Sequence, residues 1–172
     1  HNSFIPTTVT AIGTAAFSSI GYYNDSPGFS SIIIPNSVKS IGVSAFSYCR
    51  KLTSVTLPDS LKTIGEYAFE HCDLLSSITI PASVDSIGDL AFEGCYSLMT
   101  VTSMIEEPFK LGSIFWMDYR RSIFEDYENS TLYVPAGTKA LYEATDGWKK
   151  FKNIVEMVTK GDLDGKGYTD VT

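Results

Sequence analysis

The sequence repeats with a period of 23 residues, and this period constrains the fold more strongly than any other feature of the chain. Four kinds of residue recur with it: Cys49, Cys72 and Cys95; Pro35, Pro58 and Pro81; Ile41-Gly42, Ile64-Gly65 and Ile87-Gly88; and Ala45-Phe46, Ala68-Phe69 and Ala91-Phe92. One such unit buries too few apolar side chains to close a core alone, whereas stacked neighbours build a continuous core. The period therefore predicts a solenoid of 23-residue units.

Each unit contains the parts of one solenoid coil. Residues 52–57 alternate in polarity and stop at Pro58, which predicts a short strand. The pair Ile64-Gly65 indicates a bend, and residues 66–72 favour a single helical or 3₁₀ turn. The side chains expected to point inward from this turn are Ala68, Phe69 and Cys72. The predicted fold class is α/β, a right-handed solenoid with one short strand and one short helical turn in each unit.

Before the regular units the pattern is degenerate. An earlier unit consists of Ile5, Pro6, Val9, Ile12, Gly13, Ala16 and Phe17, and its Phe lies 29 residues before the next one. The six additional residues fall within segment 21–28, which contains Gly, Asn, Asp and Pro. Such a composition predicts an exposed loop.

After the last regular unit the chain becomes rich in aromatic residues: Phe109, Phe115, Trp116, Tyr119, Phe124, Tyr127, Trp148 and Phe151. A terminal segment of a solenoid must cover the apolar end of the core, which favours an irregular aromatic cap. A ligand-binding aromatic platform is the alternative interpretation of the same cluster. Residues 139–153 are amphipathic and predict a short helix in this cap.

Composition and charge exclude several classes of function. The 13 Lys and Arg against 20 Asp and Glu give a net charge of −7, which provides no electrostatic basis for binding nucleic acid. Apolar runs in the sequence stay far below the roughly 18 residues of a membrane span. His71 is the only internal His, and the sequence has no phosphate loop, nucleophile elbow or zinc motif. We therefore expect neither an enzyme nor a cofactor.

The cysteine column predicts buried, unbonded thiols. Thiols on stacked strands would keep their Cβ atoms about 4.8 Å apart, beyond the separation of about 3.5–4.5 Å that disulfides need. A metal would require clustered thiolates or His ligands, and His71 is expected to point away from Cys72. Cys49, Cys72 and Cys95 are therefore expected to be free, with no metal among them.

Acidic residues form columns as well, Glu66 with Asp89 and Glu70 with Glu93. Carboxylates at matching positions of successive units predict a solvated face of the solenoid. A cation site and a pair of catalytic carboxylates are the alternatives for the same columns.

The outward side of the predicted strands consists largely of hydroxyl side chains. Its two columns are Ser31, Ser54, Ser77 and Thr100, and Ile33, Thr56, Thr79 and Thr102. The Ser and Thr residues of these columns are the candidate ligand-binding residues. Thr ladders are also good strand surface in their own right, so a purely structural role is the alternative.

The repeat pattern resembles the bacterial leucine-rich repeats of the BspA-like type over residues 4–157. Beyond the Cys, Pro, Ile-Gly and Ala-Phe columns, the resemblance includes segment 131–138, with Val134-Pro135, and segment 147–154 near the end of the array. It implies a surface protein that adheres to a protein or glycan of a host or neighbouring cell. It also implies an extracellular or cell-surface location, and we expect a monomer. Residues 1–157 are then the solenoid and its cap.

The last residues resemble the start of a dockerin-type calcium loop. In segment 161–172, the acidic residues Asp162, Asp164 and Asp170 occupy the first, third and ninth positions of a twelve-residue loop. Lys166 stands where another oxygen ligand belongs, so we expect no calcium to bind these residues as they stand. Residues 158–172 are then a linker and an incomplete dockerin-like segment. This tail suggests a second hypothesis, in which the array is a spacer and the tail makes the contact.

Overall fold

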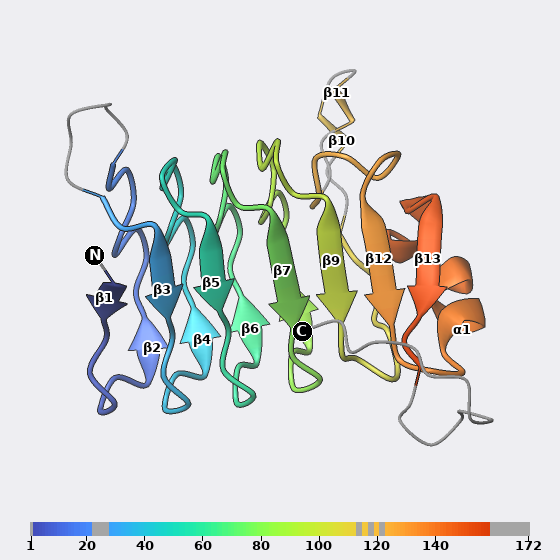
Figure 1. Ribbon diagram of the computed structural model, residues 1–172, viewed down its shortest axis with the longest axis horizontal. Coiled ribbons are helices and arrows are strands. Elements are labelled where there is room, and N and C mark those ends of the chain that lie inside the picture. Colours follow the sequence, from blue (N-terminus) through green and yellow to red (C-terminus); the bar gives the residue numbers. More distant parts are fainter. Residues whose placement is uncertain (1, 22–27, 113–114, 117–118, 121–122, 159–172) are drawn as a thin grey trace.

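The computed structural model describes residues 2–21, 28–112, 115–116, 119–120 and 123–158. Its strands lie in two rows along one solenoid (Figure 1). The front row contains β1 (Asn2–Phe4), β3 (Ser31–Ile33), β5 (Ser54–Thr56), β7 (Ser77–Ile80), β9 (Thr100–Ser103), β12 (Thr131–Val134) and β13 (Asn153–Glu156). The back row contains β2 (Ala11–Ile12), β4 (Ser40–Ile41), β6 (Thr63–Ile64) and β8 (Ser86–Ile87). A solenoid with 23-residue coils is thereby confirmed.

The paired strands of both rows are parallel, and their register follows the period of the sequence. The front row is divided between β5 and β7 into a three-stranded and a four-stranded sheet. In the front row Ser31 lies opposite Ser54, and Ser77 lies opposite Thr100. In the back row Ile41 lies opposite Ile64, which lies opposite Ile87. Each column of the sequence is therefore a line of stacked side chains in space.

The sequence predicts a bend at each Ile-Gly pair, and the structure instead has a two-residue strand of the back row that ends at the Ile. Two residues suffice for a strand here because the neighbouring coils hold it by hydrogen bonds. The Gly65 amide donates to the Ile41 carbonyl at 2.8 Å, and the Gly88 amide donates to the Ile64 carbonyl at 2.8 Å. The coils that begin at β1, β3, β5 and β7 thus contribute two strands each where the sequence indicated one.

The third side of each coil, residues 66–71 in one unit, is a run of turns where a helical or 3₁₀ turn was expected. Alternate amides bond to the next coil: Tyr67 to the Asp89 carbonyl at 3.0 Å, and Phe69 to the Ala91 carbonyl at 2.8 Å. Tyr67 has a φ of 56°, a left-handed value that interrupts any helix. The intervening amides bond within the coil to the third residue before them, Ala68 to the Gly65 carbonyl at 3.2 Å and Glu70 to the Tyr67 carbonyl at 3.1 Å. Single turns linked to the next coil therefore take the place of a continuous helix.

A stack of phenylalanine rings runs along the core, which also contains the inward Ile, Leu and Val side chains of both rows of strands. The rings of Phe17, Phe46, Phe69, Phe92 and Phe124 stack in order with centroid separations of 5.1, 5.2, 5.3 and 5.1 Å and interplanar angles of at most 5°. Phe17 stacks on Phe46 despite their 29-residue spacing, so the first coil keeps the register of the others. Of the predicted loop at 21–28, residues 22–27 lie outside the described residues.

The C-terminal end is closed by the predicted cap. It contains α1 (Lys139–Ala144) and the 3₁₀ helix η1 (Trp148–Lys150), which confirms a short helix within residues 139–153. The Trp148 indole donates to the Phe109 carbonyl at 2.9 Å, and the Tyr142 hydroxyl donates to the Ile105 carbonyl at 2.7 Å. Capping is confirmed for the buried side chains Phe124, Trp148 and Phe151.

Between β9 and the cap lies an antiparallel pair, β10 (Phe115–Trp116) and β11 (Tyr119–Arg120). The backbone of this pair is described. The side chains of Phe115, Trp116 and Tyr119, which the sequence assigned to the cap, lie outside the described residues, as does the tail from residue 159.

Candidate recognition surface

The front row presents the hydroxyl columns to the outside. Buried Ile78 and Val101 alternate with the outward residues along β7 and β9. Of the predicted residues, Ser54, Thr56, Ser77 and Thr79 are exposed, and Ser31, Thr100 and Thr102 are half-buried. We call this surface the strand face. The columns continue into the cap, where Thr131 lies opposite Thr100 and Tyr133 lies opposite Thr102.

A second exposed surface flanks the cysteine column, and sequence reasoning missed it. It consists of Tyr48, Arg50, His71, Asp73, Leu74 and Tyr96, which we call the aromatic edge. Tyr96 is 64% exposed and Leu74 is 51% exposed, so both present apolar surface to solvent. One sequence signal could have identified this edge. The positions that follow each Cys change in residue type from coil to coil, although the Cys column itself is constant.

The aromatic edge is held by contacts between successive coils. The rings of Tyr48 and His71 stack at 4.8 Å, and the ring of Tyr96 lies 6.0 Å from His71. The Arg50 guanidinium lies over the Tyr48 ring at 5.9 Å and forms an ion pair with Asp73 at 3.3 Å. These contacts fix the side chains before any ligand arrives.

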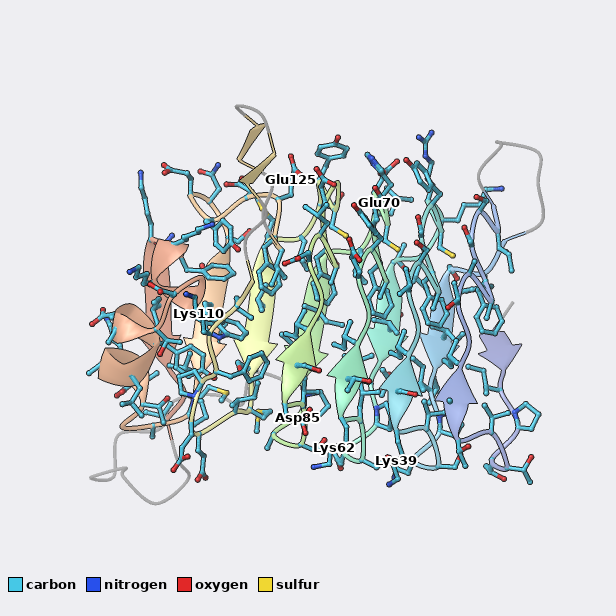
Figure 2. All side chains as sticks on the ribbon, turned by 180° about the vertical axis from the view of Figure 1, so that it is seen from behind. Lys39, Lys62, Glu70, Asp85, Lys110 and Glu125 are labelled. Atoms are coloured by element: carbon cyan, nitrogen blue, oxygen red, sulfur yellow. The ribbon has the colours of Figure 1, made fainter. Side chains whose placement is uncertain are left out.

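Charge is distributed unevenly between the two long edges of the solenoid (Figure 2). Glu70 and Glu125 lie at the edge that carries the cysteine turns, and Lys39, Lys62 and Asp85 lie at the opposite edge. Glu70 accepts a hydrogen bond from the Ser47 hydroxyl at 2.9 Å, and Glu125 accepts one from the Gly94 amide at 2.9 Å. The carboxylates beside the aromatic edge are therefore positioned by the coils.

The four column carboxylates Glu66, Glu70, Asp89 and Glu93 are all partly exposed. This exposure agrees with the predicted solvated face. Within the part of the chain that the structure describes, no three His, Cys, Asp or Glu side chains are grouped as metal ligands would be. The described helices include none that is long and apolar enough to span a membrane.

The thiols are buried and unbonded, as the sequence predicts. Each donates a hydrogen bond to a carbonyl of the preceding coil: Cys49 to Phe17 at 3.1 Å, Cys72 to Phe46 at 3.3 Å, and Cys95 to Phe69 at 3.1 Å. Burial raises the pKa of Cys49 from its ordinary value of 9.0 to about 12. The hydrogen bond with Cys95 and burial raise the pKa of Cys72 well above its ordinary value. Cys49 and Cys72 therefore stay protonated at neutral pH, and all three buried side chains contribute to packing.

We expect iodoacetamide to leave the native chain unlabelled at about pH 8, because all three thiols are buried and the reagent cannot reach them. Mass spectrometry after brief exposure should find no adduct on Cys49, Cys72 or Cys95. The same treatment in concentrated guanidinium chloride should label all of them. Rapid labelling of the native chain, or a mass that indicates a disulfide, would contradict this account of the thiols.

The chain forms parallel coils of one repeated length around a single core. It has exposed faces and a closed end, and these features define a leucine-rich-repeat solenoid. Solenoids of this kind offer extended surfaces for binding. The family model "BspA type Leucine rich repeat region (6 copies)" matches residues 19–111, so the chain belongs to the BspA-type leucine-rich repeat family. Family and fold together place it among recognition modules.

Solved bacterial leucine-rich repeat structures are similar to this chain. A leucine rich cell surface protein from Faecalibacterium prausnitzii A2-165 shares 25% identity with a TM-score of 0.54, over 92% of this chain and 32% of that one. A leucine-rich repeat protein from Bacteroides ovatus ATCC 8483 shares 28% identity with a TM-score of 0.52, over 76% of this chain and 38% of that one. The chain thus spans about a third of the length of these proteins. No curated protein matches it.

Proposed function

We propose that the chain is a non-enzymatic adhesion module, extracellular or at the cell surface, that binds a protein or glycan of a host or neighbouring cell. One observation carries the proposal: a buried, regular core holds rows of exposed side chains at fixed spacing over successive coils. Rigid presentation of this kind lowers the entropy that a binding surface loses on association. The similar Faecalibacterium prausnitzii protein is a leucine rich cell surface protein, which supports the proposed location.

The strand face is the first candidate for the contact. Its proposed residues are Ser31, Ser54, Ser77, Thr100, Thr56, Thr79 and Thr102. Their hydroxyl groups can both donate and accept hydrogen bonds, which suits a polar protein or glycan surface. With a net charge of −7, the module has no electrostatic attraction for nucleic acid. We further propose that it acts as a monomer.

The dockerin-like tail supports a second candidate function, a spacer in which residues 158–172 make the contact. Asp162, Asp164 and Asp170 carry this alternative and lie outside the described residues. The same segment has Lys166 at a ligand position, so we still expect calcium addition to leave the thermal midpoint of this chain unchanged.

A binding screen separates the two functions. The full chain and a variant that ends at Val158 are tested against a panel of glycans and extracellular-matrix proteins, with thermal unfolding as the control for folding. The adhesion module predicts at least one ligand that both chains bind with equal affinity. Binding that disappears with the tail would favour the spacer, and no binding by either chain would contradict adhesion to this panel.

A further inference from the structure

The exposed columns of the solenoid differ in how strictly they repeat. On the strand face, Thr56, Thr79 and Thr102 present the same chemistry in successive coils. Beside the cysteine column, the position after each Cys holds Arg50, Asp73 and Tyr96, and the next position holds Lys51, Leu74 and Ser97. A surface that repeats one small group offers a ligand the same contact at every coil, whereas a non-repeating surface can distinguish one partner in one register.

The aromatic edge has the composition of a protein-binding hot spot. Tyr and Arg are enriched among residues that dominate binding energy, and apolar anchors such as Leu74 and Tyr96 lose exposed surface on contact. The stacked rings of Tyr48 and His71 are already ordered, so binding costs little side-chain entropy there. His71 has room to lean across because a Cβ at Gly94 would lie 2.7 Å from its Cε1 atom.

The geometry favours a protein over a sugar. Sugar recognition by aromatic side chains needs free ring faces, and Tyr48 and His71 cover a face of each other at 4.8 Å. Arg50 also lies over the Tyr48 ring. The edges and polar atoms of the Tyr48 and His71 rings remain available to a ligand, and these suit contacts with peptide groups and side chains.

The charge of the same edge defines the partner further. The turns that carry it hold the carboxylates Glu66, Glu70, Asp73, Asp89, Glu93 and Glu125 against the cations Arg50 and Lys51. Asp73 is in addition paired with Arg50 at 3.3 Å. Among the described side chains of these turns the remaining excess is negative. Complementary charge increases both the association rate and the selectivity of a protein contact.

We propose that the aromatic edge is the specificity-determining contact of the module and that it binds a protein segment combining basic and apolar side chains. This inference rests on the proposed recognition function and assigns it to the edge rather than to the strand face.

The probe is a soluble synthetic peptide of about fifteen residues that alternates Lys and Leu, with Glu–Leu and Lys–Ser peptides of equal length as comparisons. Affinities for the full chain are measured by fluorescence anisotropy at low salt. The Lys–Leu peptide should bind best, since it alone supplies both the charge and the apolar side chains. Equal binding of the Glu–Leu peptide, or no binding of the Lys–Leu peptide, would overturn the proposal.

Two double variants locate the contact. Leu74→Ala with Tyr96→Ala should weaken binding of the Lys–Leu peptide about tenfold or more, a loss typical of hot-spot residues. The matched variant Met104→Ala with Leu141→Ala, which truncates two exposed apolar side chains outside both candidate surfaces, should bind like the unmodified chain. All four side chains are exposed, so thermal midpoints should be unchanged. A further variant, Ser77→Ala with Thr79→Ala, tests the strand face. If it loses binding and the aromatic-edge variant does not, the recognition function stands and the assignment to the aromatic edge is wrong.

Discussion

Replacing Phe69 with Ala is expected to destabilise the chain by about 3–5 kcal/mol, the range found for aromatic truncations in protein cores. Phe69 is fully buried and stacks on Phe46 at 5.2 Å and on Phe92 at 5.3 Å. The cavity cannot collapse easily, because hydrogen bonds between coils hold the neighbouring rings at a fixed spacing. The cost should therefore contain both the lost burial and the cavity.

Urea unfolding followed by circular dichroism measures this loss, with Thr79→Ala as the matched control in the same repeat. Thr79 is exposed on the strand face, so its substitution should change the free energy of unfolding by less than about 0.5 kcal/mol. A cost below about 1 kcal/mol for Phe69→Ala would contradict the proposed register of the repeats.

Gly65→Ala should be comparably severe, at about 3 kcal/mol or more. A Cβ at Gly65 would lie 2.6 Å from the carbonyl carbon of Gly42 and 2.7 Å from the amide nitrogen of Val43. Overpacking against side chains that can yield costs about 1–3 kcal/mol, and here the obstruction is the backbone of the preceding coil. The added methyl group would have to separate two coils that three sets of hydrogen bonds hold together.

The chain offers a control in the same column. Gly13 precedes Gly42 by one coil, and a Cβ there would have no described atom within 4 Å. Gly13→Ala should therefore be neutral or stabilise the chain by up to about 1 kcal/mol, because Ala restricts the unfolded state. Differential scanning calorimetry of the two variants compares them directly. Equal effects of both substitutions would contradict a close-approach role for the glycine column.

These glycines also show where sequence reasoning succeeds and where it stops. The Phe and Cys columns predict burial, because apolar residues at one period must share one side of the coil. The Ile-Gly column predicts only a bend, because a single sequence does not reveal that the missing Cβ makes room for the backbone of another coil. Hydrogen bonds between coils, which determine the back row of strands, join residues 23 or 24 positions apart in the regular units and leave no local signal.

The surface is less predictable than the core for a related reason. The strand face could be derived, since alternation along a strand assigns Thr56 and Thr79 to the outside. The aromatic edge could not be derived from the period, because Tyr48, His71 and Tyr96 occupy two different columns. They come together only because His71 extends over Gly94 toward Tyr96.

Deletion of one complete repeat tests the stacked-coil architecture most directly. Removing residues 54–76 joins Thr53 to Ser77, so that β7 takes the place of β5 and every inward column is preserved. Removing residues 54–65 instead joins Thr53 to Glu66 and moves the core residues out of register. Thermal unfolding by circular dichroism should show a cooperative transition for the 23-residue deletion and none for the 12-residue deletion. An unfolded 23-residue deletion, or two deletions that unfold alike, would contradict a solenoid of 23-residue coils.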